Sequence, residues 1–383
     1  MKAWPKVALG SVLRTYIDAV PSIQLDSVNL AGIYGFGRGL FQRGPISPLD
    51  TTYKAFHRLN AGDFVISSPK AWEGAVARIP EEFDGWFLSS VFPTFRADKQ
   101  QLDTRYLDWY CKRDAVWRQL QGKAKGMGAR RESVSPAQFL SLEIPLAPLA
   151  EQQAIVARLD LLADKARQLE AHLDAVEHDA EHLLALRFRD AIANVPLRAM
   201  AEVAPVVRRN VEIDISMRYR EVGARSFGKG LFIKPDFDGA EATWQKPVWI
   251  KAGDLVLSNI KAWEGAIAIV RETHDGCIAS HRYIACVPDP ELATVGFLAY
   301  YLLSEEGLGQ ISFASPGTAD RNRTLSLGNL GKIEVPTPPL TKQQTFDRLQ
   351  AEIAALKTKH TAIRAANAAL LPATLERIFQ QAH

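Results

Sequence analysis

Residues 145–186 carry the longest regular pattern of apolar and polar positions in the chain. Apolar residues follow one another at alternating steps of four and three, with charged or polar residues between them. This heptad pattern predicts a helix that packs lengthwise against another helix and is solvated on its other side. At 1.5 Å per residue, about 38 helical residues would span about 55 Å, which suits a spacer or a docking element. The seam positions of this helix are Ile155, Leu159, Leu162, Leu169, Leu173, Val176 and Leu183.

The chain contains one sequence unit twice. Gly37–Phe41 (GRGLF) recurs as Gly228–Phe232 (GKGLF), and Lys70–Ala75 (KAWEGA) recurs letter for letter as Lys261–Ala266. Both pairs are 191 residues apart, and so are the prolines and the Gln-Gln pair near the start of the long helix and their second copies. One unit is therefore present twice, head to tail, which predicts a pseudo-twofold internal repeat.

Each repeat is expected to hold a strand-rich domain followed by a long helix. Short apolar runs separated by Gly, Pro and Asp predict mixed α/β (α+β) domains. Asp63–Ser67 and Asp254–Ser258 are predicted to be buried strands, and residues 102–120 and 291–307 to be helical. The resulting boundaries are 1–144 and 193–335 for the two domains, and 145–192 and 336–383 for the two helices.

The second long helix is expected to begin at a capping box that starts with Thr341, and Pro372 should kink or end it, with Phe379 packing in the final turns. Two such helices can pack antiparallel as a coiled coil. His360 and Asn367 occupy seam positions, where polar residues either set the register of the pair or contact a partner subunit. The apolar seam positions of this helix are Phe346, Leu349, Ile353, Leu356, Ile363 and Leu370.

Composition and charge are those of an ordinary globular protein, with 47% apolar and 23% charged residues. The net charge of +3 is too small to indicate a polyanionic partner, so any nucleic-acid surface would be a local patch. Three cysteines without a CxxC motif fit reduced thiols better than disulfides or zinc ligands. The N-terminus has no signal core, and the apolar run Val295–Leu303 is too short to cross a bilayer. We therefore expect a cytoplasmic protein with no membrane partner.

No motif predicts a catalytic or metal site. Gly223–Gly230 nearly matches a P-loop, but Gly230 stands where a Ser or Thr would hold magnesium. A glycine-rich turn that brings the backbone close to another group is the favoured interpretation. The sequence contains neither an HExxH motif nor an Asn-Pro-Pro-Tyr string. We therefore predict no catalytic residue and no metal ligand.

Local groups of basic and aromatic residues suit DNA. The glycine-rich turns carry Arg or Lys, the KAWEG strings place a cation, an aromatic plane and a carboxylate together, and a basic loop lies near the end of each domain. Such residues can bind phosphates and read base edges. The tryptophans can equally be core anchors, and the loops can be solvated charge. The candidate DNA-binding residues are Arg38, Arg43, Lys70, Trp72, Lys123, Lys125, Arg130, Arg131, Lys229, Lys234, Lys261, Trp263, Arg321, Asn322 and Arg323.

The proline-rich strings that precede the two long helices carry a family resemblance. Residues 144–155 read IPLAPLAEQQAI and residues 335–344 read VPTPPLTKQQ. With the Ala-Gly-Asp runs and the twofold organisation, they resemble the specificity (S) subunits of type I restriction–modification systems over essentially the whole chain. Thr341 and Lys342 depart from the residues usual before Gln-Gln in that family.

The resemblance implies two target-recognition domains, each reading half of a split sequence in double-stranded DNA. It implies that the two antiparallel helices set the distance between the half-sites. It further implies no catalysis by this chain, which would hold two methyltransferase (M) subunits and the restriction/translocase (R) subunits. No cofactor is expected on this chain, since S-adenosylmethionine, ATP and Mg²⁺ would bind only to the partner subunits.

Two alternatives stay open from the sequence. The chain can be the DNA-recognition arm of another defence system, or a protein scaffold whose basic loops meet acidic partners. Because the two repeats share the KAWEGA and Gly-x-Gly-Leu-Phe strings, we also expect the two half-sites to share features, which predicts a partly palindromic split target.

Overall fold

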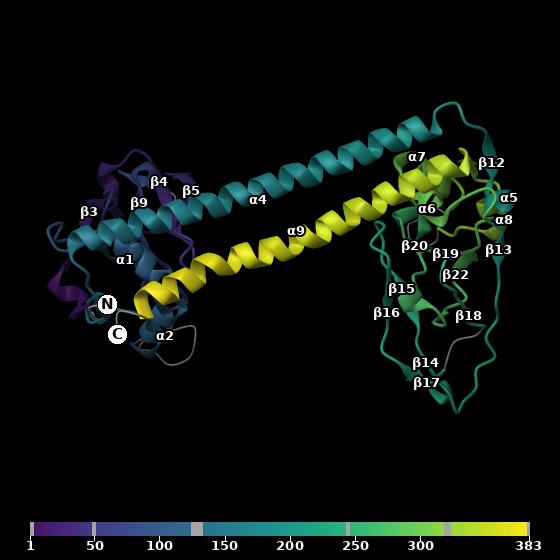
Figure 1. Ribbon diagram of the computed structural model, residues 1–383. Coiled ribbons are helices and arrows are strands. Elements are labelled where there is room, and N and C mark those ends of the chain that lie inside the picture. Colours follow the sequence, from purple (N-terminus) through teal and green to yellow (C-terminus); the bar gives the residue numbers. More distant parts are fainter. Residues whose placement is uncertain (1–3, 48–50, 124–132, 243–245, 318–322, 381–383) are drawn as a thin grey trace. The chain divides into compact units, whose positions relative to one another are not determined.

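The chain forms two compact units, and each contains parts of both long helices. Unit 1 comprises Met1–Leu173 and His360–His383, and unit 2 comprises Asp174–Lys359. Helix α4 (Leu149–Ile192) begins in unit 1 and ends in unit 2, while α9 (Leu340–Gln380) runs from unit 2 into unit 1 (Figure 1). The computed structural model describes residues 4–47, 51–123, 133–242, 246–317 and 323–380.

Unit 1 contains a four-stranded antiparallel sheet in the order β2-β10-β7-β8, a five-stranded sheet in the order β3-β6-β9-β4-β5, and the small ladder β1-β11. The hairpin β4–β5 forms the edge of the five-stranded sheet. Asp103 caps the N-terminus of helix α1, and its carboxylate accepts a hydrogen bond from the Arg105 amide. The bounds are β1 Lys6–Ala8, β2 Leu13–Thr15, β3 Asp18–Pro21, β4 Val28–Ile33, β5 Leu40–Ile46, β6 Ala55–Arg58, β7 Phe64–Ile66, β8 Val76–Arg78, β9 Phe87–Leu88, β10 Thr94–Ala97, β11 Glu143–Pro145, α1 Thr104–Cys111, α2 Asp114–Lys123 and α3 Pro136–Leu140.

Unit 2 repeats the first sheet strand for strand, in the order β13-β22-β19-β20, and repeats the small ladder as β12-β23. The five-stranded sheet recurs as three two-stranded ladders, β14-β17, β15-β16 and β18-β21, which have the same strand pairings 191 residues on. Two single bridges, Asn210–Val248 and Glu221–Ile278, stand where unit 1 has the pairings β3-β6 and β4-β9. The bounds are β12 Leu197–Ala199, β13 Val206–Val207, β14 Arg218–Tyr219, β15 Val222–Ala224, β16 Leu231–Ile233, β17 Phe237–Asp238, β18 Val248–Trp249, β19 Leu255–Ser258, β20 Ile267–Ile269, β21 Ile278–Ala279, β22 Tyr283–Cys286, β23 Glu334–Pro336, α5 Met200–Val203, α6 Val295–Leu303, α7 Glu305–Phe313 and α8 Leu327–Gly331.

The structure confirms the mixed α/β class, the internal repeat and the two buried strands, which are β7 and β19. Residues 102–120 and 291–307 are helical as predicted, but each region holds two helices in place of one. The four predicted segments, 1–144, 145–192, 193–335 and 336–383, stay a prediction, because the compact units divide the chain by contacts and cut both long helices.

The core of each unit is closed by the end of a long helix. In unit 1, the fully buried Phe379 near the end of α9 packs edge-on against Tyr106 and Tyr110 of α1, with ring centroids 5.4 and 5.1 Å away. In unit 2, Phe188 near the end of α4 lies 5.1 Å from the ring of Phe297 in α6. Phe188 and Phe379 are 191 residues apart, so the same aromatic contact closes both cores.

Two details of α9 differ from the sequence-based expectation. The helix begins at Leu340, so Thr341 lies inside its first turn and is not the N-cap; the Thr345 hydroxyl donates to the Thr341 carbonyl. Pro372 lies inside the helix, which continues to Gln380 and does not end there. The expected packing of Phe379 beyond the proline is confirmed.

The seam of the long helices shifts by one position along its length. Leu183, Ile363 and Leu370 were expected in the seam, yet they expose 42%, 41% and 47% of their surface. The more covered residues are the next ones along, Leu184, Arg364 and Leu371. A straight helix of 3.6 residues per turn lags a strict heptad by about 20° per repeat, so after several heptads the covered position moves one residue later. Among the other expected positions, Leu159, Leu173, Phe346 and Ile353 are buried, and Ile155, Leu162, Leu169, Val176, Leu349 and Leu356 are half-buried.

The polar seam residues lie where the two helices meet within unit 1. Asn367 of α9 donates through Nδ2 to the Ala166 carbonyl (3.1 Å) and to Glu170 Oε1 (2.7 Å) of α4. Arg364 pairs with the same carboxylate at 2.6 Å, and these two donors hold the pKa of Glu170 below its usual value. His360 is buried. The contacts of Asn367 favour its interpretation as a register-setting residue.

Candidate nucleic-acid interface

A six-residue loop at the tip of a hairpin occurs in both units. In unit 1, residues 34–39 join β4 to β5, and the Tyr34 amide donates to the Gly39 carbonyl at 2.9 Å. In unit 2, residues 225–230 join β15 to β16, and the Arg225 amide donates to the Gly230 carbonyl at 3.0 Å. The near match to a P-loop at residues 223–230 is therefore a hairpin turn between two strands, as the favoured interpretation predicted.

The KAWEG string forms a tight turn directly after β7. Lys70 Nζ lies 2.8 Å from Glu73 Oε1 and 5.2 Å from the centroid of the Trp72 ring. The indole N–H donates to the Pro69 carbonyl at 3.0 Å, and the half-buried ring packs against the core of unit 1. Cation, ring and carboxylate are thus together as predicted, but they satisfy one another. The same contacts recur in unit 2 among Lys261, Trp263 and Glu264, with the indole N–H bonded to the Ile260 carbonyl.

The hairpin tip and the KAWEG turn are bonded to each other through their backbones. The Phe36 amide donates to the Glu73 carbonyl (2.7 Å), and the Gly37 amide donates to the Gly74 carbonyl (2.9 Å). We call this pair of turns the tip clamp. It explains why both strings recur together in the sequence, since each is the hydrogen-bonding partner of the other. The equivalent bonds of unit 2 join Phe227 to Glu264 (2.8 Å) and Gly228 to Gly265 (2.9 Å).

The cations predicted on the hairpins are unequally available. Arg38 and Arg43 are exposed, and Arg38 Nε donates to the Gly35 carbonyl at 3.2 Å within its own turn. Lys229, the counterpart of Arg38, is exposed as well. Lys234 pairs with the buried Glu221 at 2.9 Å. Arg38, Arg43 and Lys229 therefore remain the cations of the hairpins that can meet a ligand with little rearrangement.

The basic loops are described only in part. Lys125, Arg130, Arg131, Arg321 and Asn322 lie outside the described residues, and Lys123 is the last residue of α2.

Arg323 is anchored inside unit 2. Its guanidinium donates to the carbonyls of Ser312 (2.7 Å) and Ser315 (3.2 Å) and lies 4.5 Å from the Trp263 ring centroid. Several of its donors therefore tie its own loop to α7, and its contact with DNA stays a prediction.

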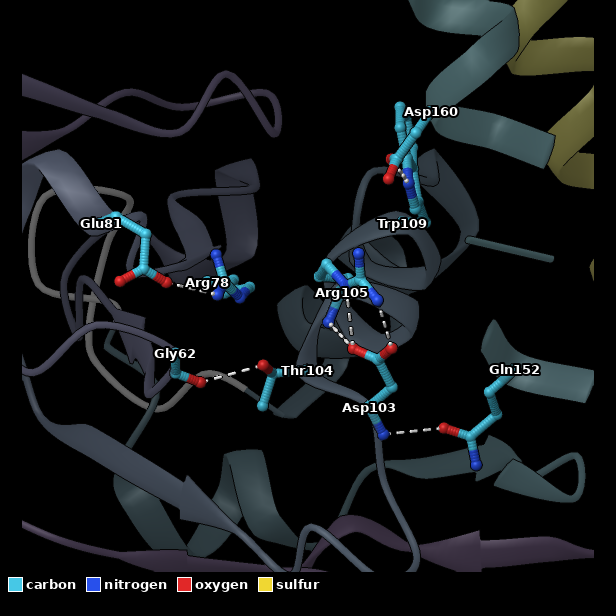
Figure 2. Close-up of polar contacts among 9 residues, drawn as sticks. All are labelled: Gly62, Arg78, Glu81, Asp103, Thr104, Arg105, Trp109, Gln152 and Asp160. Carbon is cyan, nitrogen blue, oxygen red and sulfur yellow. Dashed lines mark hydrogen bonds and ion pairs between the residues drawn. The ribbon is translucent and has the colours of Figure 1, made fainter. Parts of the chain in front are cut away.

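A buried glutamine fixes the start of each long helix, and its role was not predicted. The side chain of Gln152 is fully buried; its Oε1 accepts from the Asp103 amide (2.9 Å), and its Nε2 donates to the carbonyls of Gln101 and Ala147 (2.8 Å each). Figure 2 shows this amide facing Asp103. The recurrence of Gln-Gln after the prolines was the signal in the sequence. Gln343 repeats the three bonds in unit 2, with the Thr294 amide and the carbonyls of Leu292 and Pro338.

Unit 1 adds a second tie between its domain and α4. The indole N–H of Trp109 donates to Asp160 Oδ1 at 2.8 Å (Figure 2). Two residues near the start of α4 are therefore bonded to the domain, Gln152 to the loop before α1 and Asp160 to α1 itself. The direction in which α4 leaves its domain is therefore held by hydrogen bonds as well as by packing.

The described residues contain no group of three or more His, Cys, Asp and Glu side chains that could hold a metal ion. Cys111, Cys277 and Cys286 are free and buried, and burial raises the pKa of the Cys286 thiol to about 12. Within the described part of the chain, no helix has the length and apolar character needed to span a bilayer.

The chain is similar to known proteins in one domain and in its whole fold. Residues 2–178 match the type I restriction modification DNA specificity domain. The HsdS subunit from Thermoanaerobacter tengcongensis has the same fold, with a TM-score of 0.66 and 20% identity over 100% of this chain and 97% of that one. A chain from a structure that describes complex assembly and conformational transition of the type I R-M system also has this fold. Its TM-score is 0.68 and its sequence identity 20%, over 98% of this chain and 97% of that one. No curated protein matches in sequence.

Proposed function

We propose that this chain, which matches the type I restriction modification DNA specificity domain over residues 2–178 and has the fold of an HsdS subunit, is a type I specificity subunit that reads a bipartite DNA target with one half-site for each unit. In this proposal it contributes no catalytic group. It acts with two methyltransferase subunits and with restriction/translocase subunits in the cytoplasm, and S-adenosylmethionine, ATP and Mg²⁺ bind to those partners.

The observation that carries the proposal is the contrast between what the two units share and what they do not. The four-stranded sheet, the tip clamp and the buried glutamine are the same in both. The five-stranded sheet of unit 1 recurs in unit 2 with the same strand pairings 191 residues on. The exposed side chains on it differ, since Tyr34 and Arg38 of unit 1 stand where unit 2 has Arg225 and Lys229. Two matching frames that carry different exposed side chains suit two readers of different sequences on one ligand. The shared strings build the tip clamp, so they do not by themselves require a palindromic target.

We test the proposal by selection from a random duplex library. The chain is co-expressed with a methyltransferase subunit encoded beside it, and DNA bound by the purified complex is sequenced. The expected result is a motif of two short specified segments separated by unspecified bases. A protein scaffold without DNA specificity would leave the pool unenriched, although it would still bind the methyltransferase.

We also propose that α4 and α9 set the length of the unspecified spacer, since each unit contains the start of one helix and the end of the other. Inserting one heptad into both helices, between the parts assigned to the two units, should lengthen the spacer and leave both half-sites unchanged. Unchanged spacing, or altered half-sites in a folded variant, would argue against this role of the helices.

A further inference from the structure

Each tip clamp holds an exposed phenylalanine in a backbone conformation that is unfavourable for it. Phe36 and Phe227 both have φ 61°, in the left-handed region, and expose 62% and 76% of their surface. Among the described residues, Asn194 and Lys246 are the other non-glycine residues with positive φ. For a bulky aromatic residue this conformation is an outlier, and glycine would adopt it more easily. The same outlier at both positions of a repeat indicates a requirement for the side chain.

The clamp fixes the direction in which each ring points. The amide of the phenylalanine and that of the next glycine are both bonded to the KAWEG turn, at 2.7 and 2.9 Å in unit 1. Gly37 and Gly39 on either side of Arg38 also have positive φ, 64° and 82°. The turn is therefore rigid around the aromatic residue.

The rings are not part of the hydrophobic cores of the described structure. Phe36 touches the edge of Trp117, at 5.9 Å between centroids. Burial of the ring thus contributes little to stability, and the unfavourable backbone is not offset by packing inside the subunit. Strain that the fold maintains without a packing benefit points to a ligand contact.

Each ring lines a cavity whose walls carry basic side chains together with carboxylates, Asp114 and Glu376 in unit 1 and Glu264 in unit 2. Arg38 and Lys229 follow the phenylalanine by two residues, and Lys229 Nζ lies 5.8 Å from the Phe227 ring. In unit 2, Phe227 lines a cavity of about 880 Å³ together with Lys229, Arg271 and His274. In unit 1, Phe36 lines a cavity of about 640 Å³ that also contains aromatic and basic residues of α1 and α2.

We infer that Phe36 and Phe227 are aromatic contact residues for DNA bases, one in each half-site, and that Arg38 and Lys229 bind the neighbouring phosphates. In a duplex, an exposed aromatic ring can contact a thymine methyl in the major groove or insert between two base pairs, and the neighbouring cation on glycine-rich backbone can bind a phosphate. This inference rests on the proposed function, because it names residues of the same DNA-reading surface.

The test uses the complete complex with its methyltransferase partner and a duplex that carries the motif enriched by the wild-type complex. Phe36→Ala and Phe227→Ala should each weaken binding by roughly 5- to 150-fold, a loss comparable to that of one specified base pair. Phe36→Trp should retain most of the affinity, whereas Phe36→Leu should behave like Ala. The exposed apolar residues Ile23 and Ile215 provide matched controls, and Ile23→Ala and Ile215→Ala should bind as the wild type does.

Salt dependence and stability separate the ring from the cation and from a structural role. The Phe variants should keep the wild-type slope of log affinity against log salt concentration. Arg38→Ala and Lys229→Ala should each reduce that slope by about one, the value for one lost phosphate contact. Phe36→Gly should unfold at a temperature at least as high as the wild type while binding DNA weakly, because glycine relieves the left-handed backbone.

Three results would overturn the inference. The first is wild-type DNA affinity in both Phe36→Ala and Phe227→Ala. The second is that these Ala variants no longer bind the methyltransferase subunit in size-exclusion chromatography. The third is a fall in the unfolding temperature of Phe36→Gly. If the wild-type complex prefers no sequence at all, the proposed function itself fails, and the two failures are therefore distinguishable.

Discussion

Units 1 and 2 close the same core in two different ways. In unit 2, the end of α4 packs through Phe188, and the chain continues within four residues into β12 of the same unit. In unit 1, the end of α9 packs through Phe379 onto α1, which lies more than 260 residues earlier in the chain. Within the described residues, side chains of α9 and α1 make this contact.

Unit 1 has an ion pair at this contact that unit 2 lacks. Arg113, with 6% of its side chain exposed, forms two hydrogen bonds with Glu376, at 2.6 and 3.1 Å, and lies over the rings of Tyr110 and Phe379. The position equivalent to Arg113 in unit 2 is Ser304. The difference teaches that the same aromatic contact closes both cores, and that unit 1 adds a directional ion pair between residues far apart in the sequence.

The largest expected effect comes from Phe379→Ala. Truncating a fully buried aromatic side chain costs about 3–5 kcal/mol, and here it would release the end of α9 from unit 1. Hydrogen exchange should increase in residues 360–380 and in α1. Phe188→Ala serves as the matched variant, and it should leave the end of α4 better protected because the following strand still holds it. Equal deprotection of both helix ends would contradict the comparison.

The next effect is expected from Gln152→Leu and Gln343→Leu, which test the feature that the units share. Each removes three hydrogen bonds of a fully buried amide and leaves a backbone N–H and two carbonyls without a partner, at about 2–3 kcal/mol. Because the geometry is duplicated, the two losses of unfolding free energy should agree within experimental error. The exposed neighbours provide controls, and Gln153→Leu and Gln344→Leu should change stability little.

A smaller effect is expected from Glu376→Ala, which removes the ion pair that is specific to unit 1. The largely buried Arg113 guanidinium would lose the Glu376 carboxylate as its partner, which should lower the free energy of unfolding by about 1–3 kcal/mol. Chemical denaturation of Arg113→Ala, Glu376→Ala and the double variant measures the coupling between the two residues. Additive losses would show that the pair contributes nothing beyond the packing of each side chain.

The smallest effect tests the shift of the seam. Leu370→Ala removes an exposed side chain and should change the free energy of unfolding by less than about 0.5 kcal/mol. Leu371→Ala removes a side chain that packs against the core of unit 1 and should cost about 1–2 kcal/mol. If the thermal stabilities of the two variants rank in the opposite order, the seam follows the strict heptad of the sequence.

The sequence predicted the features that repeat and missed those that depend on contacts in space. The spacing of 191 residues identified the duplication, and the heptads located both long helices. The heptads misplaced Leu183, Ile363 and Leu370 because a small mismatch between 3.5 and 3.6 residues per turn accumulates along a helix. Both strings of the tip clamp were visible, but no local pattern shows that Phe36 and Glu73 are bonded through their backbones.

The sequence predicted which kinds of side chain gather at the candidate site, but not which groups each of them contacts. The cation, ring and carboxylate of the KAWEG turn are together as expected, and the structure shows that they pair with one another. The DNA contact expected of Arg323 stays a prediction; the sequence did not show that Arg323 donates to carbonyls of its own unit, because charge alone carries no information about which carbonyls lie nearby. The exposed Phe36 and Phe227 were not singled out, since only their backbone angles distinguish them.

The most direct test of the central claim is single-molecule sequencing of DNA methylation in a host that carries the complete system. We predict a methylated motif made of two specified segments separated by a fixed number of unspecified bases, which disappears when this chain is deleted. A contiguous motif, or methylation that persists without this chain, would contradict the assignment of one half-site to each unit.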